Sequence, residues 1–329
     1  MSDAHIRLLG LGAYVPERVM SNEEWAKYVD TSDEWIKTRT GIERRHFAAA
    51  GESTASMAVA AARCALDEVG LGPEEIDEII VTTDTPEVYI PDTASFVQHL
   101  LGAREIPAYD LGSSGCAGFL QALDIARARV NFGVGRVLVI GVELLSRLIS
   151  WQDRNTSVLF GDGAAAAIIG SGNGIAEIIS VVAGTDGSRA DILMMKVGGT
   201  RYPFTLEAAQ SGEHQHVIMN GHELFKEAVR RMSEAARQVL AKGGFTIEDL
   251  ALVVPHQANL RIIQAVSKAL RLPFSKFYIN IQEYGNTGSA SIPLALWEAR
   301  KKGLIVKGDL VLLTSFGAGF HWAAVLLRF

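Results

Sequence analysis

The sequence repeats itself at a constant shift of 173 residues, and this internal repeat restricts the fold more than any other feature. Three pairs of segments match at that shift: Glu75–Val81 with Glu248–Val254, Gly115–Ala117 with Gly288–Ala290, and Val137–Ile140 with Leu310–Leu313. One strand-and-helix unit can match another by chance, but a shared register over several segments indicates a tandem duplication. We therefore predict two halves, residues 1–173 and 174–329, that meet at a glycine-rich turn.

Short apolar runs and alanine-rich periodic segments alternate along the chain. The apolar runs predict buried strands at residues 6–11, 79–83, 137–141, 178–183, 252–255 and 310–314. The periodic segments predict helices at residues 56–69, 119–130, 224–242, 260–270 and 292–302. Because strands and helices alternate, we predict an α/β fold with mostly parallel sheets.

Charge and composition exclude several classes of protein. The chain carries 31 Lys and Arg against 37 Asp and Glu, and its net charge of −6 argues against a nucleic-acid-binding protein. Polar residues and glycines interrupt the uncharged segment Val311–Leu327, so we predict no membrane span. The chain has only two cysteines, and residues 1–7 lack the pattern of a secretion signal, which together favour a reducing, cytoplasmic location.

Cys116 is the strongest candidate for a catalytic residue. It lies in the segment Asp110–Phe119, where a short strand passes through small residues into a helix. The flanking Gly115 and Gly118 permit a tight turn, which would present the sulfur at a helix N-terminus, where free N–H groups favour the thiolate. A buried structural thiol is the alternative, and Cys64, on an amphipathic helix, fits that alternative better.

A reactive thiol needs a base or a polarising partner, and two residues at other strand ends fit this requirement. His256 follows the apolar run that ends at Pro255, and Asn286 lies in the segment of the second half that corresponds to the Cys116 turn. If the duplication holds, the three residues share one cleft. Taken singly, His256 can equally be a core histidine and Asn286 a turn residue. No histidine has metal-ligand spacing and no nucleotide-binding motif is complete, so we predict neither a metal nor a cofactor.

These segments resemble the signatures of the β-ketoacyl-acyl-carrier-protein synthase III family, in the thiolase superfamily, and the likeness covers essentially the whole chain. The segments that carry the resemblance are Thr31–Ile36, Thr38–Ile42, Gly115–Gly118, Phe160–Ala164, Pro255–Ile262 and Tyr284–Thr287. The resemblance implies a thiolase-like fold in which two duplicated α/β halves form five layers, α-β-α-β-α. It also implies a homodimer with a Cys-His-Asn site where the halves meet.

The resemblance further implies the reaction. Cys116 would take the acyl group from a short acyl-CoA, with acetyl-CoA expected, and backbone N–H groups of Cys116 and Ala318 would hold the oxyanion. Malonyl-acyl-carrier protein would then lose CO₂ while His256 and Asn286 donate hydrogen bonds to the enolate. The product, a 3-oxoacyl-acyl-carrier protein, would initiate type II fatty acid synthesis. The acyl-CoA is a substrate here, and no cofactor is implied.

Binding residues follow from the resemblance position by position. They are Trp35, Arg39, Arg154 and Asn259 for CoA, Ile90 and Phe160 for the acyl pocket, and Arg261 and Lys268 for the acidic carrier protein. Ile90 is expected to reach across from the partner subunit. The chain departs from the family at Ile90, where Phe is common, at His222 and His321, where Asn and Thr are usual, and at Ala318, which replaces a glycine. The starter chain length is therefore left open.

Three other functions stay open at this level. The first is a starter-unit synthase of secondary metabolism that uses another acyl-CoA. The second is a thiol hydrolase, and the third is a non-catalytic protein that binds acyl-carrier protein. The joint presence of Cys116, His256 and Asn286 disfavours the last two, because a hydrolase would need its third group to orient the histidine for removing a proton from water.

Overall fold

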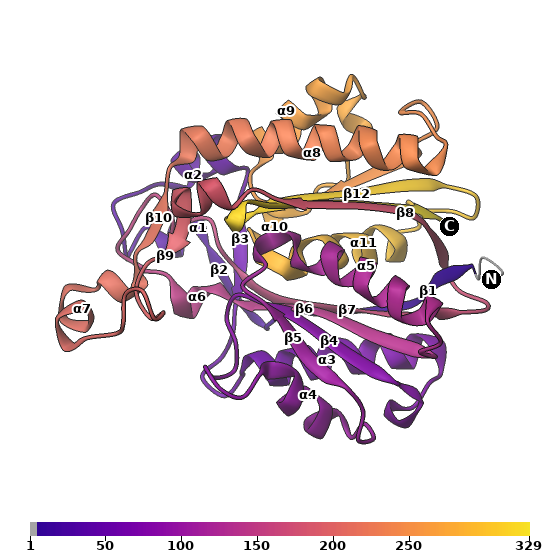
Figure 1. Ribbon diagram of the computed structural model, residues 1–329. Helices are drawn as coiled ribbons and strands as arrows, with labels where there is room; N and C mark the ends of the chain where they lie inside the picture. The colour runs from indigo at the N-terminus through magenta and orange to yellow at the C-terminus, as the bar shows by residue number, and fades with distance from the viewer. Residues whose placement is uncertain (1–4) are drawn as a thin grey trace.

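Nine strands form the framework of the protein, and Figure 1 shows them in two layers. The computed structural model describes residues 5–329. The prediction of no secretion signal concerned residues 1–7, and residues 1–4 of that segment lie outside the described range. The first layer contains β5 (Ala108–Gly112), β4 (Glu78–Thr83), β6 (Arg136–Leu144), β7 (Asp162–Ser171) and β1 (Ile6–Tyr14), in that order. The second contains β8 (Ala176–Thr185), β13 (His321–Arg328), β12 (Leu310–Gly317) and β11 (Leu252–Pro255).

The two layers are joined along one edge, where β1 pairs with β8 over only two residue pairs. Parallel pairing is confined to β4 with β5, β4 with β6, and β11 with β12. The other neighbours are antiparallel. The predicted mostly parallel sheets are therefore wrong. The reason is that β6 leads to β7, and β12 to β13, without a crossover helix between them, and parallel neighbours require such a crossover.

Helices cover both layers and also fill the space between them (Figure 1). Helices α5 (Gly118–Asn131) and α11 (Ser291–Lys301) lie between the sheets in one apolar core shared by both halves. Helices α3 (Thr54–Val69) and α4 (Thr93–Leu101) cover the first sheet, and α8 (Gly221–Gly243) and α9 (Leu260–Leu270) cover the second. This is the five-layered arrangement that the resemblance implies.

The shift of 173 residues also relates the observed elements. Helix α5 begins at Gly118 and α11 at Ser291, and each follows a short 3-10 turn, Gly115–Ala117 or Gly288–Ala290. The two turns share a left-handed first residue, with φ of 58° at Gly115 and 53° at Gly288. Glycine adopts this conformation without the steric cost of a Cβ atom. The division into residues 1–173 and 174–329 stays a prediction.

Local sequence explains how the helices that cover the sheets begin and how closely they pack. Helix α3 begins with a capping box between Ser53 and Ser56 and ends at Gly70 in the left-handed conformation. Its alanine-rich face lies so close to β1 that a Cβ atom on Gly12 would collide with the backbone of Ala61 and Ala65. Glycine at this position therefore sets the distance between helix and sheet.

The remaining elements surround the open end of the two sheets and complete the fold. They are β2 (Arg18–Ser21), α1 (Asn22–Trp25), α2 (Asp33–Thr40), β3 (Arg44–Phe47), α6 (Leu145–Leu148), β9 (Leu193–Met195), α7 (Leu206–Ser211), β10 (Val217–Met219) and α10 (Ile281–Tyr284). The segment from β9 to β10, which includes α7, projects from the body as an arm (Figure 1). Across residues 5–329 no helix is both long and apolar enough to cross a bilayer.

Candidate active site

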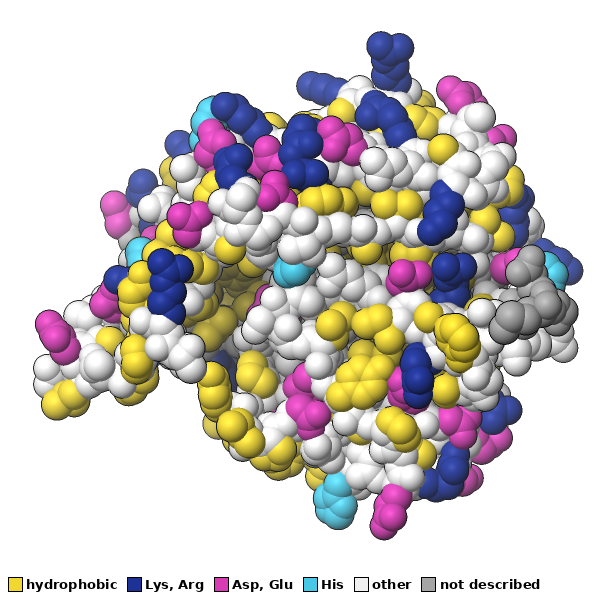
Figure 2. Space-filling view, in the orientation of Figure 1, with side chains coloured by type: hydrophobic (Ala, Val, Ile, Leu, Met, Phe, Trp, Pro, Cys, Tyr) yellow, Lys and Arg dark blue, Asp and Glu magenta, His cyan; other side chains and the backbone are white. Residues whose placement is uncertain are grey.

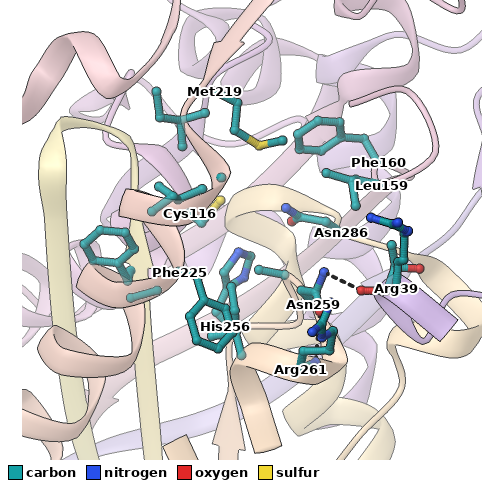
Figure 3. A pocket seen from close by; sticks show the side chains of 18 of the residues that line it. Arg39, Cys116, Leu159, Phe160, Met219, Phe225, His256, Asn259, Arg261 and Asn286 are labelled. Atoms are coloured by element: carbon teal, nitrogen blue, oxygen red, sulfur yellow. Dashed lines mark hydrogen bonds between the residues drawn. The ribbon is translucent and has the colours of Figure 1, made fainter. Parts of the chain in front are cut away.

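A cavity of about 670 Å³ is lined by residues of both predicted halves. Cys116 comes from the first half, and His256 and Asn286 come from the second, and all three line this cavity. Figure 3 shows the sulfur, the imidazole and the carboxamide directed into the same space. The structure thus brings together the three residues that the sequence pointed to from segments far apart in the chain.

Cys116 is held in place by close contact between the backbones of the two halves. A Cβ atom on Gly317, at the end of β12, would lie 2.5 Å from the Cys116 nitrogen, and one on Gly115 would lie 2.9 Å from the Ala318 nitrogen. The Ser315 hydroxyl, which is buried, donates a 2.7 Å hydrogen bond to the Cys116 carbonyl oxygen. The backbone nitrogens of Cys116 and Ala318 therefore belong to two loops in direct contact, as an oxyanion hole formed by both would require.

The protonation state of Cys116 differs from the sequence-based prediction. A helix N-terminus was expected to favour the thiolate. In the structure, burial raises the pKa of the Cys116 thiol well above its usual value, and the nearby carboxyl groups of Asp84 and Glu143 raise it further. A hydrogen bond from the Asn286 side chain acts in the opposite direction but does not reverse the shift. The prediction of a resting thiolate is therefore wrong, because burial outweighs the helix terminus.

His256 is fixed by its backbone and is neutral. It directly follows β11, is 2% exposed, and its backbone N–H donates a 2.9 Å hydrogen bond to the Thr314 carbonyl oxygen. The next side chain, Gln257, donates to the carbonyl oxygens of Pro255 and Tyr278 and so anchors this turn. Burial lowers the pKa of His256 to about 3, so the imidazole carries no charge at neutral pH.

The amide of Asn286 is oriented by its own loop. The Gly288 N–H donates a 2.9 Å hydrogen bond to Oδ1 of Asn286. The backbone of Asn286 is also held, because its N–H donates to Leu159 and its carbonyl oxygen accepts from Gly161. With Oδ1 occupied, the Nδ2 group is the one that serves the cavity, and a carboxamide NH₂ is a hydrogen-bond donor.

Aromatic and cationic side chains form the mouth of the cavity. Trp35, Arg39 and Asn259 line it, and the Asn259 amide donates a 3.1 Å hydrogen bond to the Arg39 carbonyl oxygen (Figure 3). The guanidinium carbons of Arg39 and Arg154 each lie 4.7 Å from the Trp35 ring centroid. Arg154 does not itself line the cavity. An aromatic ring stacked on Trp35 would therefore take the place of one guanidinium.

The other predicted site residues lie at different distances from the cavity. Phe160 lines it, and so does Arg261, at the start of α9. Lys268 is exposed in the last turn of the same helix, outside the cavity. Ile90 is 80% exposed on the loop that follows β4 and does not line the cavity of its own chain.

One wall of the cavity was not foreseen from the sequence. Helix α8 supplies Leu224, Phe225, Ala228 and Met232, β10 supplies Met219, and β12 supplies Phe316. Leu224, Ala228 and Met232 follow one another at intervals of four residues, so the helical period places them on one face. That spacing was a usable signal. His222, in the first turn of α8, also lines the cavity, whereas His321 is hydrogen-bonded to Thr185 beside the Gly319 loop.

Within the described part of the chain, no group of three His, Cys, Asp or Glu side chains is arranged to hold a metal ion.

The cavity thus brings together a thiol, a neutral imidazole and an oriented carboxamide, the groups expected in a condensing enzyme of the thiolase type. Comparison with known families agrees. Residues 109–187 match the family 3-oxoacyl-[acyl-carrier-protein] synthase III, and residues 240–329 match the C-terminal part of the same family. The chain therefore belongs to the 3-oxoacyl-[acyl-carrier-protein] synthase III family, and it is a condensing acyltransferase of the kind that starts fatty acid synthesis.

Individual relatives cover almost the whole chain. The chain is 47% identical to β-ketoacyl-[acyl-carrier-protein] synthase III of Caldanaerobacter subterraneus subsp. tengcongensis, over 98% of this chain and 97% of the relative. The crystal structure of the synthase III from Aquifex aeolicus superimposes with a TM-score of 0.90 at 44% identity, covering 98% of this chain and 100% of that one. The priming β-ketosynthase of the R1128 polyketide pathway superimposes with a TM-score of 0.90 at 37% identity, covering 99% and 96%.

The neutral state of His256 predicts how acid affects folding. The imidazole titrates near pH 6.5 in an unfolded chain and near pH 3 in the folded protein, so the unfolded state binds more protons as the pH falls, and stability is lost. Between pH 7 and pH 5 this one residue should lower the free energy of unfolding by about 2 kcal/mol. Urea unfolding of His256→Gln and wild type at both values measures the difference. An equal loss in both proteins would show that His256 titrates normally.

Proposed function

We propose that the protein condenses a short acyl group, taken from acyl-CoA with acetyl-CoA expected, with malonyl-acyl-carrier protein to form a 3-oxoacyl-acyl-carrier protein. The observation that carries this proposal is the convergence of Cys116, His256 and Asn286 on one cavity at the junction of the halves. Cys116 is the nucleophile, and His256 and Asn286 polarise the malonyl thioester. The reaction needs no cofactor, because thiol, imidazole and amide supply all the groups that it uses.

In the first half-reaction the Cys116 sulfur forms a bond to the acyl carbon, and the bond from that carbon to the CoA sulfur breaks. The thiol proton leaves with CoA, which departs as a thiol. The oxyanion of the tetrahedral intermediate lies between the backbone N–H groups of Cys116 and Ala318, on the two loops that Gly115 and Gly317 allow into contact. The resulting thioester on Cys116 is neutral, which suits a buried site better than a thiolate does.

In the second half-reaction the malonyl thioester loses CO₂ and negative charge develops on its carbonyl oxygen. His256 and the Nδ2 group of Asn286 donate hydrogen bonds to that oxygen. Burial of His256 supports this role, because an imidazole that is neutral before the reaction keeps one N–H to donate without a permanent charge to neutralise. The enolate carbon then attacks the acyl thioester, and the sulfur of Cys116 leaves and takes up a proton.

The mouth of the cavity suits a CoA substrate. The adenine ring takes the place of the Arg154 guanidinium on Trp35, and Arg154 then moves to cover the other face of the adenine. Arg39 and Asn259, which are hydrogen-bonded to each other, line the path of CoA into the cavity. Phe160 forms part of the acyl pocket. Arg261 and Lys268, seven residues apart on α9, present positive charge to the acidic carrier protein.

We further propose that the active form is a homodimer. Strand β5 is an edge strand with a hydrogen-bonded neighbour on one side only. The loop between β4 and α4 exposes Tyr89 to 77% and Ile90 to 80%, and Figure 2 shows hydrophobic side chains on the face where Figure 1 places β5. An exposed edge with apolar neighbours favours pairing with a second copy. Ile90 then contributes to the acyl pocket of the partner subunit rather than to its own.

A second candidate differs in the pathway and the starter unit. The 37% identity with a priming β-ketosynthase of a polyketide pathway supports a starter-unit synthase with another acyl-CoA. The chemistry at Cys116 is the same in both. A competition assay with acetyl-, isobutyryl- and longer acyl-CoA thioesters distinguishes them by the preferred starter unit. A direct assay is needed because one or two methylenes in the pocket wall change selectivity by only about 1 to 3 kcal/mol.

The assigned division of labour predicts different losses in the two half-reactions. Asn286→Ala should slow condensation about 100- to 1,000-fold, because it removes a donor to the enolate, while labelled acetyl-CoA still acylates the thiol at close to the normal rate. Mass spectrometry locates the acetyl group, and Cys116→Ser is the control that should carry none. Condensation at the normal rate in Asn286→Ala would refute its role. Free acetate as the main product of the wild type would instead indicate a hydrolase.

Charge reversal on α9 should weaken binding of the carrier protein. Arg261→Glu and Lys268→Glu should each raise the KM for malonyl-acyl-carrier protein about tenfold, with a smaller effect at high salt. Lys268 is outside the cavity, so its variant should leave the KM for acyl-CoA unchanged. Lys307→Glu, an equal charge change at an exposed position between β11 and β12, is the matched control. Equal effects of all three variants would show that only net charge matters.

The homodimer is tested by mass in solution. Sedimentation equilibrium at micromolar concentration should give twice the mass of the chain. Ile90→Glu should shift the equilibrium toward monomer and change the preference among acyl-CoA substrates, because a charge replaces an apolar side chain in the interface. A monomeric wild type, or a dimer with unchanged acyl preference in Ile90→Glu, would contradict the assignment of this residue.

A further inference from the structure

Two carboxyl groups lie next to Cys116, and neither lines the substrate cavity. Glu143, near the end of β6, is fully buried. Asp84, just after β4, is partly buried. Within residues 5–329, no Lys, Arg or His is among the groups that shift the pKa of either carboxyl. Two buried acids without a cation are costly, and such groups concentrate at functional sites.

Glu143 is nevertheless fully supplied with hydrogen bonds. Its carboxyl accepts from the hydroxyl of Ser289 at 2.9 Å, from the hydroxyl of Thr85 at 2.9 Å, and from the backbone N–H of Asp84 at 3.1 Å. Each of these donors favours the charged form of the carboxyl group. The site is thus built to hold an acid in one orientation.

Asp84 connects this cluster to the nucleophile. Its Oδ1 atom accepts a 3.2 Å hydrogen bond from the backbone N–H of Gly115, the left-handed residue immediately before Cys116. The backbone N–H of Asp84 in turn donates to Glu143. A chain of two hydrogen bonds therefore runs from Glu143 through Asp84 to the turn that carries Cys116.

The internal repeat shows where this cluster stands relative to the active site. At the shift of 173 residues, Ser289 corresponds to Cys116 and Glu143 corresponds to Phe316. Phe316 lines the substrate cavity beside Cys116, whereas Glu143 binds the Ser289 hydroxyl and packs against Gly288. The second half thus has its own copy of the turn, Gly288–Ala290, and the Glu143 side chain fills the space in front of it. The two acids lie beside this buried turn, next to the turn of Cys116, which lines the cavity.

Asp84 and Glu143 raise the pKa of the Cys116 thiol further than burial alone does. Burial, and then the proximity of Asp84, raises the pKa of Glu143 to about 8, and burial raises the pKa of Asp84. Because the two groups influence each other, they titrate as a pair, and Glu143 ionises mainly above neutral pH. His256 is the other titratable group facing Cys116, and it is neutral, so nothing packed around the sulfur in the described structure offsets their negative charge.

We propose that Asp84 and Glu143 form a positioning pair for the nucleophile: they fix the Gly115–Cys116 turn through the Gly115 N–H, and their carboxyl groups, next to the turn, add to the effect of burial in disfavouring a thiolate at Cys116. The inference rests on the proposed role of Cys116. Negative charge near the sulfur raises the free energy of a thiolate but not that of a neutral thioester. It therefore acts on the free enzyme and not on the acyl-enzyme. A resting thiol is also protected from alkylation and oxidation, because the thiolate is the reactive form.

The test measures the pH at which Cys116 reacts with iodoacetamide. In a Cys64→Ser background Cys116 is the only cysteine left. Asp84→Asn and Glu143→Gln should each move the inflection of the alkylation rate to lower pH, and the double variant should move it furthest. At pH 7.5 the double variant should react at least about tenfold faster, equivalent to one pH unit. Both replacements keep an oxygen that accepts the same hydrogen bonds.

Glu78→Gln is the matched control. Glu78 is a buried carboxyl at the other end of β4, where it pairs with Arg129, and its variant should leave the inflection unchanged. Unchanged inflections in Asp84→Asn, Glu143→Gln and the double variant would overturn the proposal, as would an equal shift in Glu78→Gln. If one variant does not fold, as judged by circular dichroism, the other single variant decides. Failure of the proposed function would appear differently, as absence of an acetyl group on Cys116.

Discussion

The contact between two backbone loops, one from each half, underlies the rest of the structure. Gly115 and Gly317 have no side chain, and any Cβ atom there would strike the opposite loop. Because both positions are glycine, the turn that carries Cys116 and the end of β12 touch, and the cavity forms at the junction. The shared core around α5 and α11 holds the halves in this relation. The placement of sulfur, imidazole and amide follows from that contact.

Electrical neutrality is the second constraint on the site. Burial makes ionisation of both the thiol and the imidazole unfavourable, and the amide has no charge to lose. The free enzyme therefore holds no charge on the groups that are to meet substrate. Charge develops only during the reaction, where fixed donors can stabilise it at little cost in reorganisation. The cationic side chains that line the cavity, Arg39 and Arg261, lie away from the sulfur (Figure 3).

The sequence predicted the elements with strong local patterns better than the features that depend on contacts between distant segments. Strands such as β11 and helices such as α9 follow from apolar runs and helical period, because those signals are local. Strand β7 was not predicted, since its first six residues, Asp162–Ala167, include four alanines and no β-branched residue, and its antiparallel pairing depends on contacts with β1 and β6. The resting thiol was also missed, because its main cause, burial of Cys116, and its smaller cause, the approach of Asp84 and Glu143, both arise only on folding.

The two turns related by the repeat differ in their access to the cavity. One copy opens to solvent through the cavity, while the other is sealed by an acid and three hydroxyl-bearing side chains, Ser289, Thr83 and Thr85. Exchanging Ser289 for cysteine would therefore place a second sulfur in a compartment that no thioester can enter. Of the two turns related by the repeat, the one at Cys116 lines the cavity and the one at Ser289 is buried, so changes in the cavity lining would reach the first turn and not the second.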